Sequence, residues 1–108
     1  MRRGEIWSVA ARGAYTGKPR PAVIVQDDRF DATASVTVCV LTSDPTEAPL
    51  FRLRVQSDEL NGLGRASSLM VDKLTTVPRR SLGEQIGRLG DEDITRLDRA
   101  IVVFLGLA

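Results

Sequence analysis

The stretch KPRPAVIVQDDRFDATASVTVCVLTS, which runs from Lys18 to Ser43, decides the fold of this chain. It predicts two β-strands, a β-branched run from Ala22 to Gln26 and another from Val36 to Thr42, with a polar loop between them. If these strands pair antiparallel, the start of the first lies beside the end of the second. The cation Arg20 and the hydroxyl of Thr42 then become neighbours at one edge of the sheet, which suggests a site as well as a fold.

Further strands are predicted on both sides of this pair. They are Glu5 to Val9, Leu50 to Ser57, Ser67 to Val77 and Gln85 to Leu89, with a short helical turn from Pro78 through Leu82. A strand-rich chain with about one substantial helix indicates a mainly β (α+β) fold. We expect a small, strongly curved antiparallel sheet or SH3-like barrel with a C-terminal amphipathic helix.

The C-terminal helix is predicted to begin at Gly90-Asp91, with Asp91 as N-cap and acidic residues in the first turn, where the helix dipole favours them. Apolar residues then recur at helical spacing, at Ile94, Leu97, Ile101, Phe104 and Leu105. We expect this face to close one side of the barrel.

Composition limits the number of domains, the possible metal and catalytic sites, and the class of partner. The 108 residues predict a single domain, 1–108, and no apolar run approaches the ~20 residues that a membrane span needs. No histidine is present, which excludes His-Cys zinc sites and His-based acid–base catalysis within the chain. The lone Cys39 is expected in the core, and with no visible signal peptide we expect a cytoplasmic protein. The net charge of +1 is not that of a strongly basic nucleic-acid binder.

The strand from Leu50 to Ser57 carries two arginines on one face. Phe51, Leu53 and Val55 alternate with Arg52, Arg54 and Gln56, the period of a half-buried strand. The two guanidinium groups would stand about 7 Å apart. They suit either a solvated face that discourages edge-to-edge aggregation or a track for phosphates.

Short motifs follow one another in a distinctive order along the whole chain. They are RGEIW at residues 3–7, RPAVIVQ at 20–26, VCVLTS at 38–43, the run at 67–77 followed by RSL at 80–82, IGRL at 86–89, DE at 91–92 and LGL at 105–107. Taken together this order resembles the MazF/PemK toxins, which are sequence-specific messenger-RNA endoribonucleases of bacterial toxin–antitoxin pairs. One departure is the segment GAYTGKPRP at 13–21, where the family usually has GSEQxGxRP.

The resemblance implies an SH3-like barrel of the CcdB and PemK kind, a homodimer, and RNA cleavage without a metal or other cofactor. It implies that Arg20 and Thr42 form the catalytic pair. It also implies an antitoxin partner whose acidic, disordered tail occupies the RNA groove. The residues that we expect to contact single-stranded RNA are Thr16, Lys18, Ser43, Ser67 and Lys73.

The expected chemistry uses the RNA 2′-hydroxyl as nucleophile and gives a 2′,3′-cyclic phosphate and a 5′-hydroxyl end. A guanidinium stabilises charge that develops on the phosphoryl oxygens, and a hydroxyl can donate to one of them. Arginine is a poor proton acceptor at neutral pH. Asp27, Asp28, Asp72 and water are all conceivable bases.

Two other functions fit a small barrel. One is a non-catalytic toxin that poisons a protein such as DNA gyrase, which would need a distinctive C-terminal tail, whereas residues 104–108 read as a helix end. The other is a plain interaction module with an aromatic peptide groove, which an aromatic content of 5% does not favour.

Overall fold

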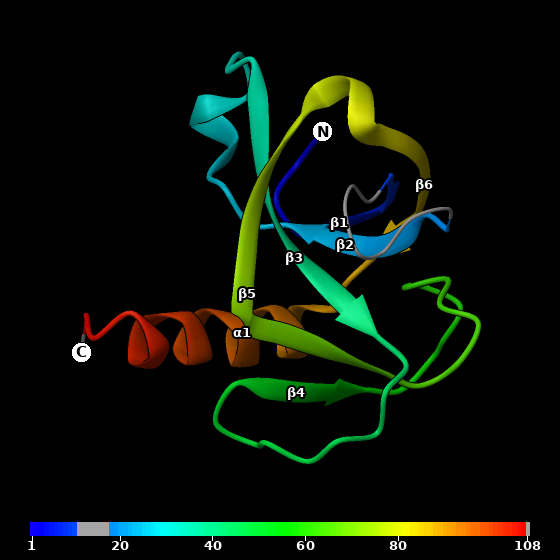
Figure 1. Cartoon of the computed structure of the whole chain (residues 1–108), viewed down its shortest axis with the longest axis vertical. Helices are drawn as coiled ribbons and strands as arrows, with labels where there is room; N and C mark the ends of the chain where they lie inside the picture. The colour runs from blue at the N-terminus through cyan, green and yellow to red at the C-terminus, as the bar shows by residue number, and fades with distance from the viewer. Residues whose placement is uncertain (11–17, 108) are drawn as a thin grey trace.

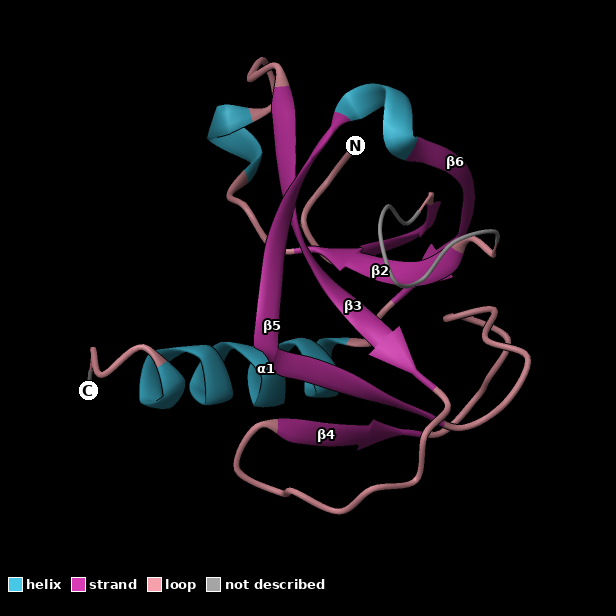
Figure 2. Ribbon diagram, viewed as in Figure 1, coloured by secondary structure: helices cyan, strands magenta, loops and turns pink. Residues whose placement is uncertain are grey.

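The β-branched segments of the chain form a six-stranded antiparallel sheet, and a C-terminal helix lies against it (Figure 1, Figure 2). The structure is a computed structural model that describes residues 1–10 and 18–107. In chain order the elements are β1 (Glu5–Val9), β2 (Arg20–Ile24), the 3-10 turn η2 (Asp28–Phe30), β3 (Ser35–Thr42), β4 (Arg52–Val55), β5 (Ser67–Pro78), the 3-10 turn η3 (Arg79–Ser81), β6 (Leu82–Arg88) and α1 (Asp91–Phe104).

The strands lie in the order β4-β5-β3-β2-β1-β6, and each recorded neighbouring pair is antiparallel. This confirms the expected antiparallel sheet with one C-terminal helix. Over the described residues no pairing joins β4 to β6, so the sheet curves strongly, as expected, and keeps two edges instead of closing into a barrel. Long strands that twist can curl in this way without closing.

The strand pair that was predicted from residues 18–43 is β2 and β3, although β2 is shifted toward its N-terminus. It covers Arg20–Ile24 because Arg20 already pairs with Val9 of β1. Gln26 leaves the ladder, and its side-chain Oε1 accepts the backbone N–H of Thr37 at 2.9 Å. The amide side chain therefore replaces a strand hydrogen bond and ends β2 early.

The sheet buries apolar side chains on both faces. The face toward α1 holds the larger cluster, in which Val23, Cys39, Leu41, Leu69 and Leu97 are fully or almost fully buried. Val9, Ala22, Ile24, Val36 and Val38 form the second cluster on the concave face, with Trp7 packed against it. The core role that was predicted for Cys39 is confirmed. Burial raises the pKa of the Cys39 thiol to about 12, so this thiol is protonated at neutral pH.

β5 is bent in the middle, and the bend gives the sheet much of its curvature (Figure 1). Cys39 of β3 pairs with Leu74, but Leu41 pairs with Leu69, so Met70 to Lys73 of β5 face the single residue Val40. Extra residues in one strand of a pair bend that strand and re-aim its side chains. The bend is braced by Arg52 of β4, whose Nε and Nη2 donate to the two carboxylate oxygens of Asp72 at 2.8 and 3.0 Å.

The helix differs from its prediction at both ends. Gly90, not Asp91, is the N-cap residue, and Asp91 is the first residue of α1. Leu97 and Ala100 are its buried residues, whereas Phe104 and Leu105 are exposed by 46% and 53%. Its last turn is therefore only partly covered: the ring of Phe104 packs against that of Phe51, with ring centroids 6.3 Å apart, whereas Leu105 is exposed. No helix in the described part of the chain has the length and apolarity to cross a membrane.

Candidate functional site

Arg20 is the first residue of β2 and lines a pocket on the concave face of the sheet. The pocket has a volume of about 390 Å³. Its polar lining comes from Arg20, Lys73, Thr75, Thr76 and Ser81, and its apolar lining includes Val9, Val40, Met70 and Val77. A guanidinium and an ammonium group beside an apolar lining suit a ligand that carries both a phosphate and a flat apolar face.

Lys73 reaches this pocket because of the bend in β5. It is exposed and follows Asp72 at the point where β5 departs from the register of β3. The ion pair of Asp72 with Arg52 fixes that point, with the two side chains only 22% and 15% exposed. The structure thus brings Lys73 and Arg20, two residues predicted separately, to one cavity.

Thr42 is the last residue of β3 and is almost buried, with 9% of its surface exposed. The recorded pairs between β2 and β3 end at Ala22 and Val40, and the same register continued by two residues sets Arg20 opposite Thr42. Ala22 and Val40 belong to the concave face, so alternation along each strand directs Arg20 and Thr42 toward that face too. The Oγ1 atom of Thr42 accepts the backbone N–H of Asp44 at 3.2 Å, which leaves its own proton for donation.

The other residues predicted to contact substrate are spread more widely. Lys18 and Ser43 are exposed next to Arg20 and Thr42 in the chain. Ser67 is buried, and its hydroxyl donates to the carbonyl of Arg65 at 3.1 Å, away from the pocket lining. Thr16 lies outside the described residues.

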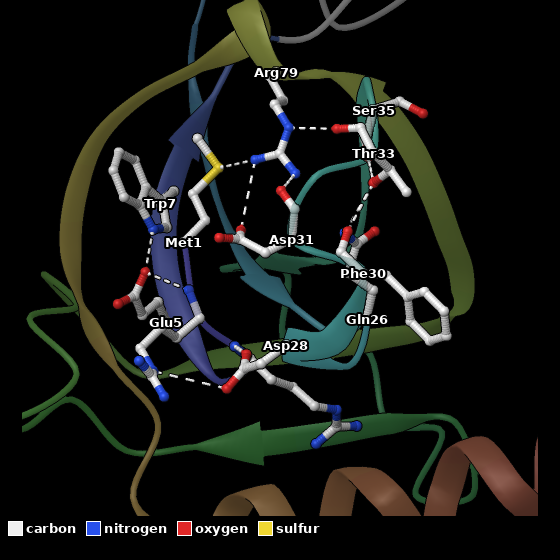
Figure 3. Close-up of polar contacts among 12 residues, drawn as sticks. Met1, Glu5, Trp7, Gln26, Asp28, Phe30, Asp31, Thr33, Ser35 and Arg79 are labelled. Carbon is white, nitrogen blue, oxygen red and sulfur yellow. Dashed lines mark hydrogen bonds and ion pairs between the residues drawn. The ribbon is translucent and has the colours of Figure 1, made fainter.

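Two of the carboxylates considered as bases, Asp27 and Asp28, follow the C-terminal end of β2, the end opposite Arg20; Asp28 is shown in Figure 3. Asp28 accepts the backbone N–H of Arg3 at 2.6 Å. Asp27 caps η2 by accepting the backbone N–H of Arg29 at 2.8 Å, and this hydrogen bond lowers the pKa of Asp27. Both are engaged in holding the loop between β2 and β3, so neither is placed to serve Arg20.

The third carboxylate, Asp72, is committed to Arg52. Hydrogen bonds from Arg52 lower the pKa of Asp72, which makes this carboxylate a weak base. Asp44 follows Thr42 closely, but its carboxylate accepts the hydroxyl and backbone N–H of Thr46, and these bonds lower the pKa of Asp44. Among the described residues, none that lines the pocket with Arg20 is acidic.

Sequence analysis missed Ser68, which pairs directly with Thr42 across β3 and β5. The signal was present in the alternation of the strand. Leu69 and Val71 face the helix, so Ser67 shares their face, whereas Ser68 and Met70 face the opposite side. Period two therefore favours Ser68 over Ser67 as the hydroxyl on the face of Thr42.

Metal ligands are not clustered in the described part of the chain: residues 1–10 and 18–107 hold no group of three or more cysteine, aspartate or glutamate side chains that could bind an ion.

Comparison with known sequences gives a match over nearly the whole chain. A family model for the PemK-like, MazF-like toxin of type II toxin–antitoxin systems matches residues 2–105. The chain is also 61% identical over 108 residues to a protein of Mycolicibacterium smegmatis named "Probable endoribonuclease MazF", with coverage of 100% of this chain and 99% of that protein.

Solved structures share the fold. A mycobacterial endoribonuclease in complex with its cognate antitoxin superposes with a TM-score of 0.81 at 21% identity, over 100% of this chain and 97% of that one. The Mycobacterium tuberculosis toxin MazF-mt6 superposes with a TM-score of 0.77 at 27% identity, over 92% and 93%. The curved sheet with a C-terminal helix is therefore the fold of known toxins.

Proposed function

The chain belongs to the PemK-like, MazF-like toxin family of type II toxin–antitoxin systems, and on that premise we propose that it is an endoribonuclease that cuts single-stranded RNA, such as messenger RNA, at a short specific sequence. Arg20 and Thr42 are its catalytic pair. The relative at 61% identity over the full chain carries the endoribonuclease name, which does not favour a gyrase poison.

The observation that carries this proposal is the pocket that Arg20 and Lys73 line together. It lies on the concave face, toward which alternation also directs Thr42. Two cations can bind the sugar–phosphate backbone, while Val40, Met70 and Val77 provide an apolar surface for a base.

The reaction needs no nucleophile from the protein. The 2′-oxygen of the RNA attacks the adjacent phosphorus, a new P–O2′ bond forms, and the P–O5′ bond breaks. The products are a 2′,3′-cyclic phosphate and a 5′-oxygen that takes up a proton. Arg20 stabilises the negative charge on the non-bridging oxygens with its guanidinium group. Thr42 donates its hydroxyl proton to one of these oxygens.

Water accepts the proton of the 2′-hydroxyl in this mechanism. Asp27 and Asp28 lie at the far end of β2, and Asp72 is paired with Arg52. Without a strong base the rate is modest, and most of the acceleration comes from alignment of the strand and from the charge of Arg20.

The family also implies partners. We propose that a cognate antitoxin neutralises this protein by laying an acidic segment over the pocket of Arg20 and Lys73, and that both proteins act in the cytoplasm, where their RNA target is found. Complex formation is known for the mycobacterial structure described above, which contains a cognate antitoxin.

The active form is proposed to be a homodimer. The last turn of α1 and the residues after it expose Val103, Phe104, Leu105 and Leu107, and exposed apolar groups of this kind are commonly covered by a partner. Light scattering should give twice the chain mass of 11.8 kDa, and Val103→Asp should shift the protein toward the monomer. A folded wild-type monomer at micromolar concentration would contradict this part.

One experiment tests the activity. Purified protein, free of antitoxin, is incubated with a long single-stranded RNA in EDTA, and the new ends are mapped. We expect discrete cuts with 5′-hydroxyl ends. Intact RNA in the presence of folded protein would contradict the endoribonuclease proposal, and cutting that EDTA abolishes would contradict the metal-free mechanism.

A further inference from the structure

A second hollow lies on the side of β4 and is lined by Ser68, the strand partner of Thr42. Its volume is about 500 Å³, and its lining includes Arg54, Ser68, Arg96 and the loop from Pro45 to Pro49. Neither the proposed mechanism nor the family comparison gives this hollow a role.

Sheet register connects the hollow to Thr42. Thr42 pairs with Ser68 across β3 and β5, and Ser68 pairs with Arg54 across β5 and β4. Directly opposed residues of an antiparallel sheet point to the same face, so these three side chains form one row. Two strand spacings separate Arg54 from Thr42, which is roughly 10 Å between their Cα atoms. If one phosphate of an extended RNA strand lies at Thr42, the length of the Arg54 side chain lets its guanidinium reach a neighbouring phosphate across that gap.

The hydrogen bonds within the row leave donors facing outward. Nη1 of Arg54 donates to Oγ of Ser68 at 3.3 Å, so the hydroxyl proton of Ser68 remains for another acceptor. Thr42 has the same arrangement with the N–H of Asp44. An anion that passes along the row would meet hydroxyl and guanidinium donors in succession.

Arg54 and Arg52 share a strand face, but their surroundings differ. Arg52 is 15% exposed and makes two hydrogen bonds to the carboxylate of Asp72. Arg54 is exposed, and within residues 1–10 and 18–107 it forms no ion pair within 4.0 Å. The structure thus keeps the charge of Arg54 available for an outside anion while Arg52 braces the sheet.

The rest of the lining adds two more cations, Arg52 and Arg96, and one acid, Glu47. Nη1 of Arg96 on α1 donates to the carbonyl of Arg54 at 3.0 Å and to Asp93 at 2.8 Å, so Arg96 holds β4 as well as contributing charge. Glu47, on the loop, is exposed and is not among the recorded partners of Arg54.

We infer that Arg54 and Ser68 bind an RNA backbone phosphate that flanks the cleaved one, an inference that rests on the proposed endoribonuclease activity. Arginine binds a phosphate diester through two parallel N–H donors, which a neutral side chain cannot imitate. Because this phosphate does not react, its contact lowers KM and leaves kcat nearly unchanged. Arg54 is therefore a binding residue, and Arg20 is a catalytic one.

The first test compares Arg54→Gln with Arg99→Gln, which removes the same charge from an exposed position on α1 that lines neither pocket. The probe is a short RNA that carries the mapped cleavage site with a 2′-O-methyl group on the nucleophile, labelled for fluorescence anisotropy. Arg54→Gln should raise Kd at least fivefold and should reduce the slope of log K against log salt concentration by about 0.7, the value for one single-strand phosphate contact. Arg54→Lys should restore the slope. Equal Kd values and equal slopes for the two glutamine variants would overturn the inference.

The second test neutralises single phosphates of the same RNA as methylphosphonates, one and two positions on each side of the cleaved bond. Neutralisation of the phosphate at one flanking position should weaken RNA binding by wild-type protein. Neutralisation of the same phosphate should cause no further loss of affinity in Arg54→Gln, which already lacks the contact. Equal losses for both proteins at every position would again overturn the inference. Failure of the parent proposal would be distinct, because wild-type protein would then leave unmodified RNA uncut.

Discussion

The two ends of the β2–β3 strand pair use arginine in different ways. At the loop end, Arg79 donates to the carbonyls of Asp31 and Thr33, contacts the sulfur of Met1 at 3.2 Å, and lies 3.7 Å from the carboxylate of Asp31 (Figure 3). At the other end, Arg20 and Arg54 line pockets that flank the hydroxyls of Thr42 and Ser68.

The two ends differ in where the guanidinium groups lie: Arg79 contacts the loop of its own chain, whereas Arg20 and Arg54 lie on pocket walls. A guanidinium whose donors are used by carbonyls and carboxylates of its own chain stabilises the fold. One that is placed on a pocket wall beside hydroxyl groups can bind an outside anion. We therefore propose that the loop end stabilises the fold and that the end with Arg20, Thr42, Ser68 and Arg54 binds RNA.

The largest effect is expected from Arg20→Ala. Removal of a guanidinium that stabilises the transition state should lower kcat about 100-fold to 1,000-fold. The melting temperature should change little, because Arg20 stands at the start of a strand whose core residues remain. Cleavage is followed with the mapped RNA, and circular dichroism checks the fold. A folded variant that cuts at the wild-type rate would move the active site away from this end.

Thr42→Val comes next. The substitution keeps the shape of the side chain but removes the hydroxyl, and kcat should fall about 10-fold to 100-fold through loss of one donor to the phosphoryl group. Stability should drop by about 1 kcal/mol, because the N–H of Asp44 loses its acceptor. Thr42→Ser retains the hydroxyl and should recover most of the rate; a serine variant as slow as the valine variant would indicate a packing role only.

Arg79→Gln should reverse the pattern of Arg20→Ala. The loop between β2 and β3 loses its hydrogen bonds to the guanidinium, so the free energy of unfolding should fall by about 1–2 kcal/mol, a shift of several degrees in melting temperature. Activity per folded molecule at 25 °C should remain that of the wild type. A variant with the melting temperature of the wild type but a low cleavage rate would contradict the separate roles of the two ends.

The smallest expected effect is a change of protein stability with pH through the Arg52–Asp72 ion pair. Arg52 lowers the pKa of Asp72 below its ordinary value of 3.8. A carboxyl group whose pKa is lower in the folded state than in the unfolded state stabilises the protein at pH values above its unfolded-state pKa. This stabilisation is lost as the pH falls through the folded-state pKa. Wild-type protein should therefore be more stable than Asp72→Asn at pH 7, and urea titrations should show the difference shrinking below about pH 4. A difference that stays constant with pH would contradict an ionised Arg52–Asp72 pair.

Much of this site could be predicted from the chain, because β-branched runs and antiparallel pairing locate strand ends. The β-branched run before Thr42 predicted that a strand ends at this residue. The observed register of β2 and β3, continued by two residues, sets Arg20 beside that strand end, as expected. Ser68 also lay within reach of the alternation rule, although Ser67 was preferred.

The remaining features depend on contacts between distant segments. Arg52 and Arg54 are equivalent by period two, and only the bend in β5, which carries Asp72 to Arg52, separates them. The exposed Phe104 and Leu105 share the helical spacing of buried Leu97, and only tertiary contacts decide how far each is covered. Asp28 is near Arg20 in sequence, yet the length of β2 puts the two residues at opposite ends.

The central claim is that RNA binds at the end of the sheet that carries Arg20, Thr42, Ser68 and Arg54. The most direct measurement is a ¹H–¹⁵N NMR titration of the protein with the 2′-O-methyl RNA. We predict that backbone signals shift at residues 40–43, 54 and 67–70, while those at 28–34 stay in place. Shifts confined to residues 28–34 would contradict the claim.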